Sequence, residues 1–193
     1  MKKELEELKE KIENYKPYNE QEKQDKKVML DYINNFDNIL TRENEFGHFT
    51  ASSWVVNNQR TKVLMIYHNI YNSWTWTGGH ADGEHDLLGT AVRELKEETG
   101  VTNVKVLKPD IFSLENICVN GHVKRGKYVS SHVHLNLTYL LEVDEKETLQ
   151  IKEDENSGVR WIPIEDIDKY STEPWMVEKV YKKLKEKLKD FNN

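Results

Sequence analysis

The sequence has a single cysteine, Cys118, and no apolar run that approaches the length of a membrane span. One cysteine excludes a disulfide framework and any cysteine-based zinc cluster. The N-terminal stretch MKKELEELKE lacks the apolar core of a signal peptide, so a cytoplasmic location is expected. The net charge of −6 argues against binding nucleic acid over the whole surface. We therefore expect neither a membrane nor a nucleic-acid partner.

The N-terminal quarter of the chain is poor in glycine and has a helical pattern. Apolar residues recur there at helical spacing before Pro17: Leu5, Leu8, Ile12 and Tyr15. A second helix is predicted over residues 20–40, with its apolar side formed by Met29, Ile33, Phe36 and Leu40. We expect residues 1–48 to form a helical arm that is structural or makes a subunit contact, as in a homodimer. Residues 49–193 would then form the main domain, since 193 residues favour one principal domain with a small extension.

From residue 49 onwards the hydrophobic period changes to that of strands. Strands are predicted over 49–56, 62–68, 101–107, 112–119 and 128–143, and a strand leading into a short helix over 158–167. A helix is predicted over 87–99, and an amphipathic C-terminal helix over 173–191 turns Val177, Val180, Tyr181, Leu184 and Leu188 inward. This alternation predicts the α/β class, with a mixed sheet and helices on both of its faces.

The predicted helix 87–99 carries an unusual concentration of acidic residues. Its apolar arc is formed by Leu88, Ala91, Val92 and Leu95. Glu94, Glu97 and Glu98 share the neighbouring arc, which spans only about 100°. Like charges near the negative end of the helix dipole are destabilising, and a hard divalent cation with oxygen ligands, Mg²⁺ or Mn²⁺, would relieve the repulsion. The plain alternative is a solvated acidic face.

Glycines before this helix favour the metal-binding interpretation, because backbone can approach an anionic ligand closely at Gly78, Gly79 and Gly83. Asp86 is a suitable N-cap, and Gly100 is suitable for the position after the last turn.

Residues 79–101 as a whole resemble the signature of the Nudix hydrolases, G-x5-E-x7-R-E-U-x-E-E-x-G-U, where U is a bulky apolar residue. The matching residues are Gly79, Arg93-Glu94-Leu95, Glu97-Glu98 and Gly100-Val101. His85 stands where the family has its first glutamate, which often pairs with the arginine. We expect Glu84 or Asp86 to supply that pairing, and we do not expect His85 to be a metal ligand.

The resemblance implies a Nudix-type α/β/α sandwich with a mixed sheet, which covers roughly residues 49–170 and leaves the arm as an extension. It implies metal-dependent hydrolysis of a diphosphate linkage in a nucleoside diphosphate joined to another moiety, of the nucleoside triphosphate or nucleotide sugar class. Mg²⁺ or Mn²⁺ would be held by Glu94, Glu97 and Glu98. Glu98 or Glu155 would act as the general base, with Asp154 and Glu153 as alternatives to Glu155; a plain polar turn at 154–158 is the other interpretation.

A small-molecule nucleotide is the expected partner, and its binding site is predicted from basic and polar residues. The candidate substrate contacts are Gly79, His80, Arg93, Lys124, Arg125, Lys127 and His134. His134 shares one face of a predicted strand with His132 and Asn136, a face that lines a cleft or is simply solvated.

Two other functions fit the same resemblance. A Nudix-fold sensor would bind a nucleotide without cleaving it, but the three glutamates are all present. A Nudix-fold diphosphate isomerase would use a cysteine ahead of His80, where this chain has Gly78 and Gly79. Hydrolysis of a diphosphate in the presence of Mg²⁺ would distinguish the hydrolase from the sensor and the isomerase. The sequence does not identify the substrate.

Overall fold

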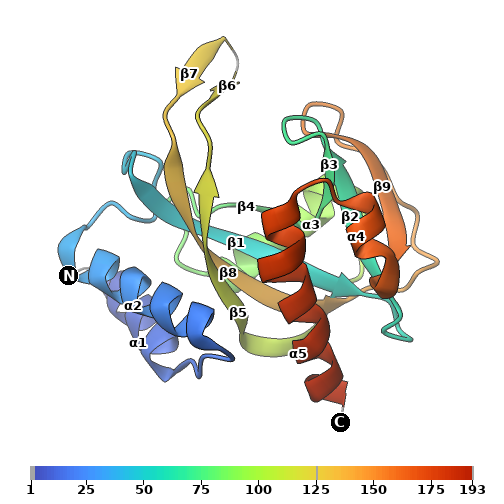
Figure 1. The fold of residues 1–193 in the computed structure, drawn as a ribbon, viewed down its shortest axis with the longest axis horizontal. Coiled ribbons are helices and arrows are strands. Elements are labelled where there is room, and N and C mark those ends of the chain that lie inside the picture. Colours follow the sequence, from blue (N-terminus) through green and yellow to red (C-terminus); the bar gives the residue numbers. More distant parts are fainter. Residues whose placement is uncertain (1–2, 125, 193) are drawn as a thin grey trace. The chain divides into compact units, whose positions relative to one another are not determined.

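The computed structural model describes residues 3–124 and 126–192 (Figure 1). Helices α1 (Lys3–Asn14) and α2 (Glu20–Asn35) come first, and helix α3 (Leu87–Thr99) lies in the middle of the chain. The strands are β1 (Gly47–Val56), β2 (Lys62–His68), β3 (Ser73–Thr75), β4 (Thr77–His80), β5 (Lys105–Val119), β6 (His122–Lys124), β7 (Lys127–Val129), β8 (His132–Glu142) and β9 (Asn156–Pro163). The C-terminal part continues as η1 (Ile164–Asp166), α4 (Ile167–Tyr170), η2 (Met176–Tyr181) and α5 (Lys182–Asn192).

The main sheet has the strand order β3-β2-β1-β8-β5, with β4 paired to β1 and β9 paired to β2. Strand β2 is apolar along its length, and Val63, Leu64, Met65 and Ile66 are fully buried. It lies antiparallel to β9, with Leu64 opposite Trp161. A mixed sheet with flanking helices is the α/β/α sandwich that the sequence predicts.

The chain divides into two compact units, each described by itself below. Unit 1 comprises Met1–Ala51, Gly79–Thr90 and Asp110–Thr138, and unit 2 comprises Ser52–Gly78, Ala91–Pro109 and Tyr139–Asn193. Strands β1, β5 and β8 and helix α3 contribute residues to both units.

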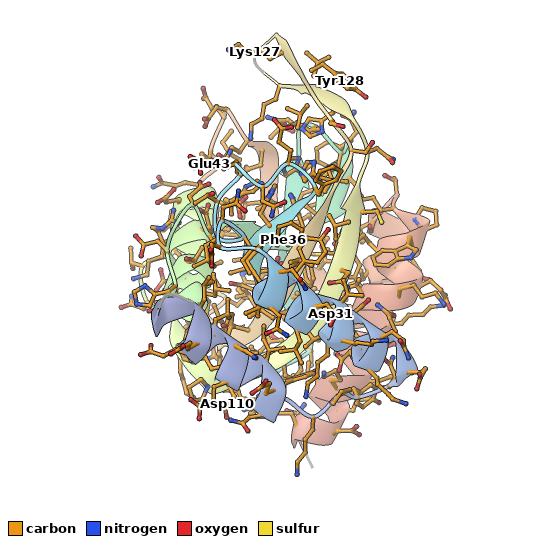
Figure 2. All side chains as sticks on the ribbon, turned by 90° about the vertical axis from the view of Figure 1, so that its left-hand side faces the viewer. Asp31, Phe36, Glu43, Asp110, Lys127 and Tyr128 are labelled. Carbon is orange, nitrogen blue, oxygen red and sulfur yellow. The ribbon has the colours of Figure 1, made fainter. Side chains whose placement is uncertain are left out.

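Helices α1 and α2 belong to unit 1 and lie side by side (Figure 1). The predicted apolar stripe of α1 is buried at Leu5, Leu8 and Ile12. Helix α2 ends at Asn35, five residues earlier than predicted, because Asn35, Asp37 and Asn38 favour turns over helix. Phe36 is extended, with φ −134° and ψ 133°, and it is 42% exposed (Figure 2). The prediction that the helix continues through Phe36 to Leu40 is therefore wrong.

A buried carboxylate holds the arm to the sheet of unit 1. Glu22 of α2 is 0% exposed, and its Oε2 accepts hydrogen bonds from the Tyr15 hydroxyl at 2.6 Å and the Tyr18 N–H at 2.7 Å. Its Oε1 accepts a hydrogen bond of 2.8 Å from the hydroxyl of Ser113 on β5. Burial, together with the charge of Glu22, raises the pKa of Tyr15 above its usual range. The hydrophobic pattern of the arm gives no sign of this polar anchor.

A second buried carboxylate, Glu115, continues the same network along β5. Ser113 Oγ also lies 2.5 Å from Glu115 Oε1, so its single hydroxyl hydrogen is shared between the two carboxyl groups. Glu115 Oε2 accepts hydrogen bonds from Asn136 Nδ2 at 3.1 Å and from Thr138 Oγ1 at 2.9 Å, both on β8. The polar network therefore runs from the arm through β5 to β8 within unit 1.

Three predicted boundaries in the sheet and the last helix are corrected by the structure. The two strands predicted over 101–107 and 112–119 are one continuous strand, β5, and the long strand predicted over 128–143 is interrupted between β7 and β8. The last helix begins with the π-type turn η2, which is wider than an α-helical turn. That turn buries Met176 and leaves Val177 half-buried, whereas Val180, Tyr181, Leu184 and Leu188 are buried as predicted. Within the described residues, every helix is too short or too polar to cross a membrane.

The buried position of Glu22 yields a stability prediction. Replacing Glu22 with alanine leaves the hydroxyls of Tyr15 and Ser113 and the N–H of Tyr18 without this acceptor, so we expect Glu22→Ala to lower the free energy of unfolding by about 2–4 kcal/mol. Urea denaturation measures the loss. Glu20→Ala, which removes an exposed carboxylate two residues earlier in the same helix, is the matched control and should cost much less. Equal stabilities of the two variants would mean that Glu22 does not anchor the arm.

Candidate functional site

Helix α3 spans Leu87–Thr99, as the sequence predicts. Asp86 was predicted to cap this helix, and its Oδ1 accepts a hydrogen bond of 3.1 Å from the N–H of Gly89. At the other end Gly100 has φ +75°, the left-handed conformation that glycine adopts without strain. Ala91 and Leu95 are fully buried, so the apolar arc fixes the rotation of the helix and thereby the direction of its glutamates.

Glu98 is the buried member of the acidic group in unit 2, with 3% of its surface exposed. Its Oε2 accepts a hydrogen bond of 3.0 Å from the N–H of Gly78, and its backbone carbonyl accepts one of 2.9 Å from Asn156 Nδ2. Burial raises the pKa of the Glu98 carboxyl well above its usual range, and the charges of Glu94 and Glu155 raise it further. Glu98 is thus held in place from both its side chain and its backbone.

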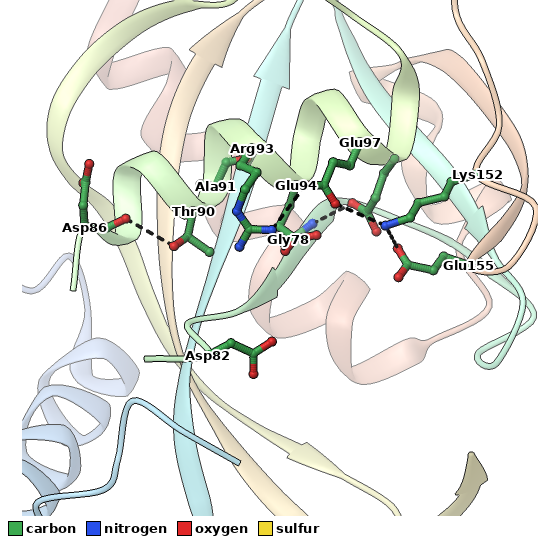
Figure 3. Close-up of polar contacts among 12 residues, drawn as sticks. Gly78, Asp82, Asp86, Thr90, Ala91, Arg93, Glu94, Glu97, Lys152 and Glu155 are labelled. Carbon is green, nitrogen blue, oxygen red and sulfur yellow. Dashed lines mark hydrogen bonds and ion pairs between the residues drawn. The ribbon is translucent and has the colours of Figure 1, made fainter. Parts of the chain in front are cut away.

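Arg93 neutralises the two outer glutamates of α3 (Figure 3). Its Nη1 lies 2.8 Å from Glu94 Oε1 and 3.4 Å from Glu97 Oε1. Arg93 therefore pairs with glutamates of its own helix. The expected partners were Glu84 or Asp86, but Asp86 caps the helix instead. Burial raises the pKa of Glu94, the charge of Arg93 opposes this, and the charges of Glu97 and Glu155 add to the rise.

Lys152 joins Glu155 to the same group, and sequence reasoning missed it. Its Nζ lies 3.3 Å from Glu97 Oε2 and 3.1 Å from Glu155 Oε2 (Figure 3). The N–H of Glu155 donates to the Lys152 carbonyl at 2.8 Å, which closes the turn that presents both side chains. Burial works against the charge of Lys152, but the hydrogen bonds and charges of Glu155 and Glu97 outweigh it and raise the lysine's pKa. The polar turn after residue 151 therefore contributes a carboxylate beside α3.

The chemistry of these side chains fits a hard divalent cation. Four carboxylates provide oxygen ligands of the kind that Mg²⁺ and Mn²⁺ prefer. Two side-chain cations, Arg93 and Lys152, already occupy the space between Glu94, Glu97 and Glu155, which shows that positive charge is favoured there. The structure tests neither the metal nor the role of each glutamate, which stay predictions.

The candidate substrate residues fall on different elements of the chain. Gly79 and His80 lie on β4, and His134 lies on β8. Lys124 and Lys127 are opposite each other across the β6–β7 hairpin and are exposed; Figure 2 labels Lys127. Arg93 is engaged by glutamates, and Arg125 lies outside the described residues. Their contacts with substrate stay predictions.

The structure gathers four histidines in unit 1: His48, His80, His132 and His134. Sequence reasoning placed His132 and His134 on one strand face but missed His48. The alternation along residues 132–136 was a visible signal. No signal in the sequence indicated that β1, which carries His48, pairs with β4 and lies next to β8.

A search against protein-family models matches the NUDIX domain to residues 47–186. An RNA pyrophosphohydrolase of Pelagibacter ubique is 32% identical over 146 residues, which cover 72% of this chain and 90% of that protein. A probable DHNTP pyrophosphohydrolase of Lactococcus lactis subsp. cremoris is 33% identical over 86 residues, 45% of this chain and 49% of that protein.

Solved structures share the fold. A hydrolase of the NUDIX family from Clostridium perfringens has a TM-score of 0.54 at 21% identity, and the match covers 75% of this chain and 97% of that one. The Ap4A hydrolase of C. elegans in a binary complex has a TM-score of 0.52 at 20% identity, covering 74% and 96%. At these identities the likeness shows the fold alone.

Proposed function

The chain belongs to the NUDIX domain family, and from this premise we propose that it is a metal-dependent pyrophosphohydrolase of a nucleoside triphosphate or nucleotide sugar. That it is a diphosphate-cleaving hydrolase follows from the family and from the curated relatives. The observation that carries the finer proposal is the convergence of Glu94, Glu97 and Glu98 on α3 with Glu155 from the loop before β9.

Each glutamate has a proposed role. Glu94, Glu97 and Glu98 would hold Mg²⁺ or Mn²⁺. When bound, the cation neutralises phosphate charge and lowers the pKa of a bound water. Glu98 or Glu155 would accept the proton of the attacking water as general base. Glu98 is fixed by Gly78 and Asn156, whereas the Glu155 side chain is 39% exposed and free to reorient once Lys152 is displaced.

Cations on the β6–β7 hairpin support an anionic substrate. Lys124 and Lys127 project exposed ammonium groups from adjacent positions across the hairpin, and a polyphosphate is the kind of group they would attract. We propose that these two lysines, together with Gly79, His80, Arg93, Arg125 and His134, contact the nucleotide.

The two curated relatives both carry the name pyrophosphohydrolase, which supports attack on a pyrophosphate linkage here. The relative that covers most of this chain is named for RNA, and it favours the 5′-triphosphate end of RNA as a second candidate substrate. The net charge of −6 favours the free nucleotide. A screen of nucleoside triphosphates, nucleotide sugars and 5′-triphosphorylated RNA with Mg²⁺, which reads released phosphate and pyrophosphate, decides between them. Binding of a nucleotide without turnover of any compound would favour the sensor alternative.

The proposed roles predict a large kinetic effect at Glu98. Glu98→Gln keeps the shape and the acceptor for Gly78 but removes the charge, so we expect a loss of about a thousandfold in rate, equivalent to roughly 4 kcal/mol. Thermal melts in chelator should show an unchanged or higher midpoint, because repulsion is relieved. Steady-state rates on the substrate found in the screen measure the effect. Glu84→Gln, an exposed residue ahead of the helix, is the control, and a near wild-type rate for Glu98→Gln would contradict the proposal.

Lys152 competes with any metal for Glu97 and Glu155. In Lys152→Met the metal-free protein loses a neutralising charge, and a cation no longer has to displace the ammonium group. We therefore expect a lower thermal midpoint in chelator and a larger gain on adding Mg²⁺ than in wild type. Lys96→Met, which removes an exposed lysine from α3, should behave as wild type. An identical Mg²⁺ response in Lys152→Met would place the metal away from Glu97 and Glu155.

A further inference from the structure

Four imidazole rings meet in unit 1 around His48. Its ring centroid lies 5.1 Å from that of His80, 5.0 Å from His132 and 5.3 Å from His134. His134 is in turn 4.9 Å from both His80 and His132. One ring nitrogen from each of the four lies within 4.8 Å of the others, and among the described residues this is the group of metal-ligating side chains that converges most clearly.

Backbone carbonyls fix the tautomers of two of these rings. His48 Nδ1 lies 3.0 Å from the carbonyl of Asn44, and His132 Nδ1 lies 2.8 Å from the carbonyl of Ser130. A carbonyl only accepts, so each Nδ1 carries the proton and each Nε2 keeps its lone pair. Carbonyl partners of this kind orient histidines that bind metals through the other nitrogen.

The lone pairs of the two oriented rings face into the cluster. His132 Nε2 lies 3.1 Å from His134 Nε2. His48 is 4% exposed, and its Nε2 is buried without a hydrogen-bond partner. A buried nitrogen with a free lone pair costs free energy unless a ligand uses it.

Burial favours the neutral form of three of the four rings. Burial lowers the pKa of His134 to about 2 and that of His80 to about 3, and neighbouring charges act in the same direction: chiefly His80 on His134, and Arg42 on His80. Burial also lowers the pKa of His48. Neutral imidazole is the form that binds a metal, so no proton has to be removed from these three rings first.

We propose that His48, His80, His132 and His134 form a metal site for Zn²⁺ or another first-row divalent ion of similar softness, separate from the carboxylate site. Four nitrogens at zinc–nitrogen distances of 2.0–2.1 Å stand about 3.3 Å apart in a tetrahedron, close to the 3.1 Å between His132 and His134. The remaining nitrogens lie within 4.8 Å of one another and would move closer together around the ion; three of the four rings are only half-buried.

The charges around the cluster test this proposal against an anion site. Arg42 and Lys124 act electrostatically on His80, which would suit a phosphate. Arg42 is already paired with Asp82, with Nε 2.7 Å from Oδ1. The Nε2 atoms of His48 and His132 are acceptors, and a phosphate oxygen facing them would meet lone pairs instead of N–H groups. The tautomers therefore favour a cation.

A site with four protein ligands is closed, so its role is structural, and it would replace the nucleotide contacts proposed above for His80 and His134. The ligands come from β1, β4 and β8, and a bound ion would join these strands within unit 1. Because the site exists only in the folded chain, the free energy of binding the ion adds to the stability of the fold.

Zinc binding by the full chain tests the proposal. The protein is stripped with a chelator and titrated with Zn²⁺ alone, against a chromophoric chelator and in excess Mg²⁺ to saturate the carboxylates. We expect one equivalent of tight Zn²⁺ and a higher thermal midpoint. His134→Ala should weaken binding by at least about a hundredfold. His85→Ala, which removes an exposed histidine outside the cluster, should bind zinc as wild type does, and so should Glu98→Gln.

Wild-type protein also gives a test that needs no variant. Zn²⁺ should shift the ring ¹⁵N resonances of four histidines, and Co²⁺ should produce the intense visible bands of tetrahedral coordination. Absence of tight zinc in wild type, unchanged affinity in His134→Ala, or loss of zinc in Glu98→Gln would overturn the proposal. The last result would place the ion at the carboxylates, and because turnover is not measured here, none of these outcomes bears on the proposed hydrolase activity.

Discussion

Repulsion among carboxylates is the constraint around which unit 2 is organised. Glu94, Glu97 and Glu98 share one side of the last turns of α3, where the helix dipole already disfavours negative charge, and Glu155 is added from a distant loop. The chain offsets the repulsion with an arginine, a lysine and one backbone N–H. These partners are local and replaceable, since each is an ion pair at a partly exposed position or a single hydrogen bond. A divalent cation can therefore displace them, which is what a reversible metal site requires.

Unit 1 contains carboxylates in a different environment, and they have a different consequence. Glu22 and Glu115 are fully buried, and their oxygens accept hydrogen bonds from hydroxyl, amide and backbone donors. Such a network leaves no ligand to be exchanged, and its cost is offset only while every donor stays in place. The same functional group thus serves as a fixed anchor in the arm and, in the proposed metal site, as an exchangeable ligand on α3. The difference lies in what surrounds each carboxylate.

The features that follow from local sequence were predictable, and the features that depend on tertiary pairing were not. The limits of α3 followed from Asp86, its apolar period and Gly100, since capping and periodicity are local. Lys152 was missed, because the resemblance to the Nudix hydrolases indicated only a carboxylate from this loop, Glu155, and nothing in the segment itself singles out the lysine. The burial of Glu22 on α2 and of Glu115 on β5 was equally hidden, because charged side chains are normally expected to be solvated.

The histidine cluster shows how ligand chemistry can separate two ions in one chain. The carboxylate oxygens of α3 are hard ligands that suit Mg²⁺, which gives up its hydration shell reluctantly. Neutral imidazoles have no charge with which to draw a hard cation out of water. A cation enters such a site only if its bonds to nitrogen are strong, as those of Zn²⁺ are. The proposed site would therefore leave Mg²⁺ outside the histidines, and Mg²⁺ in cellular excess would hold the glutamates without competing for the nitrogens.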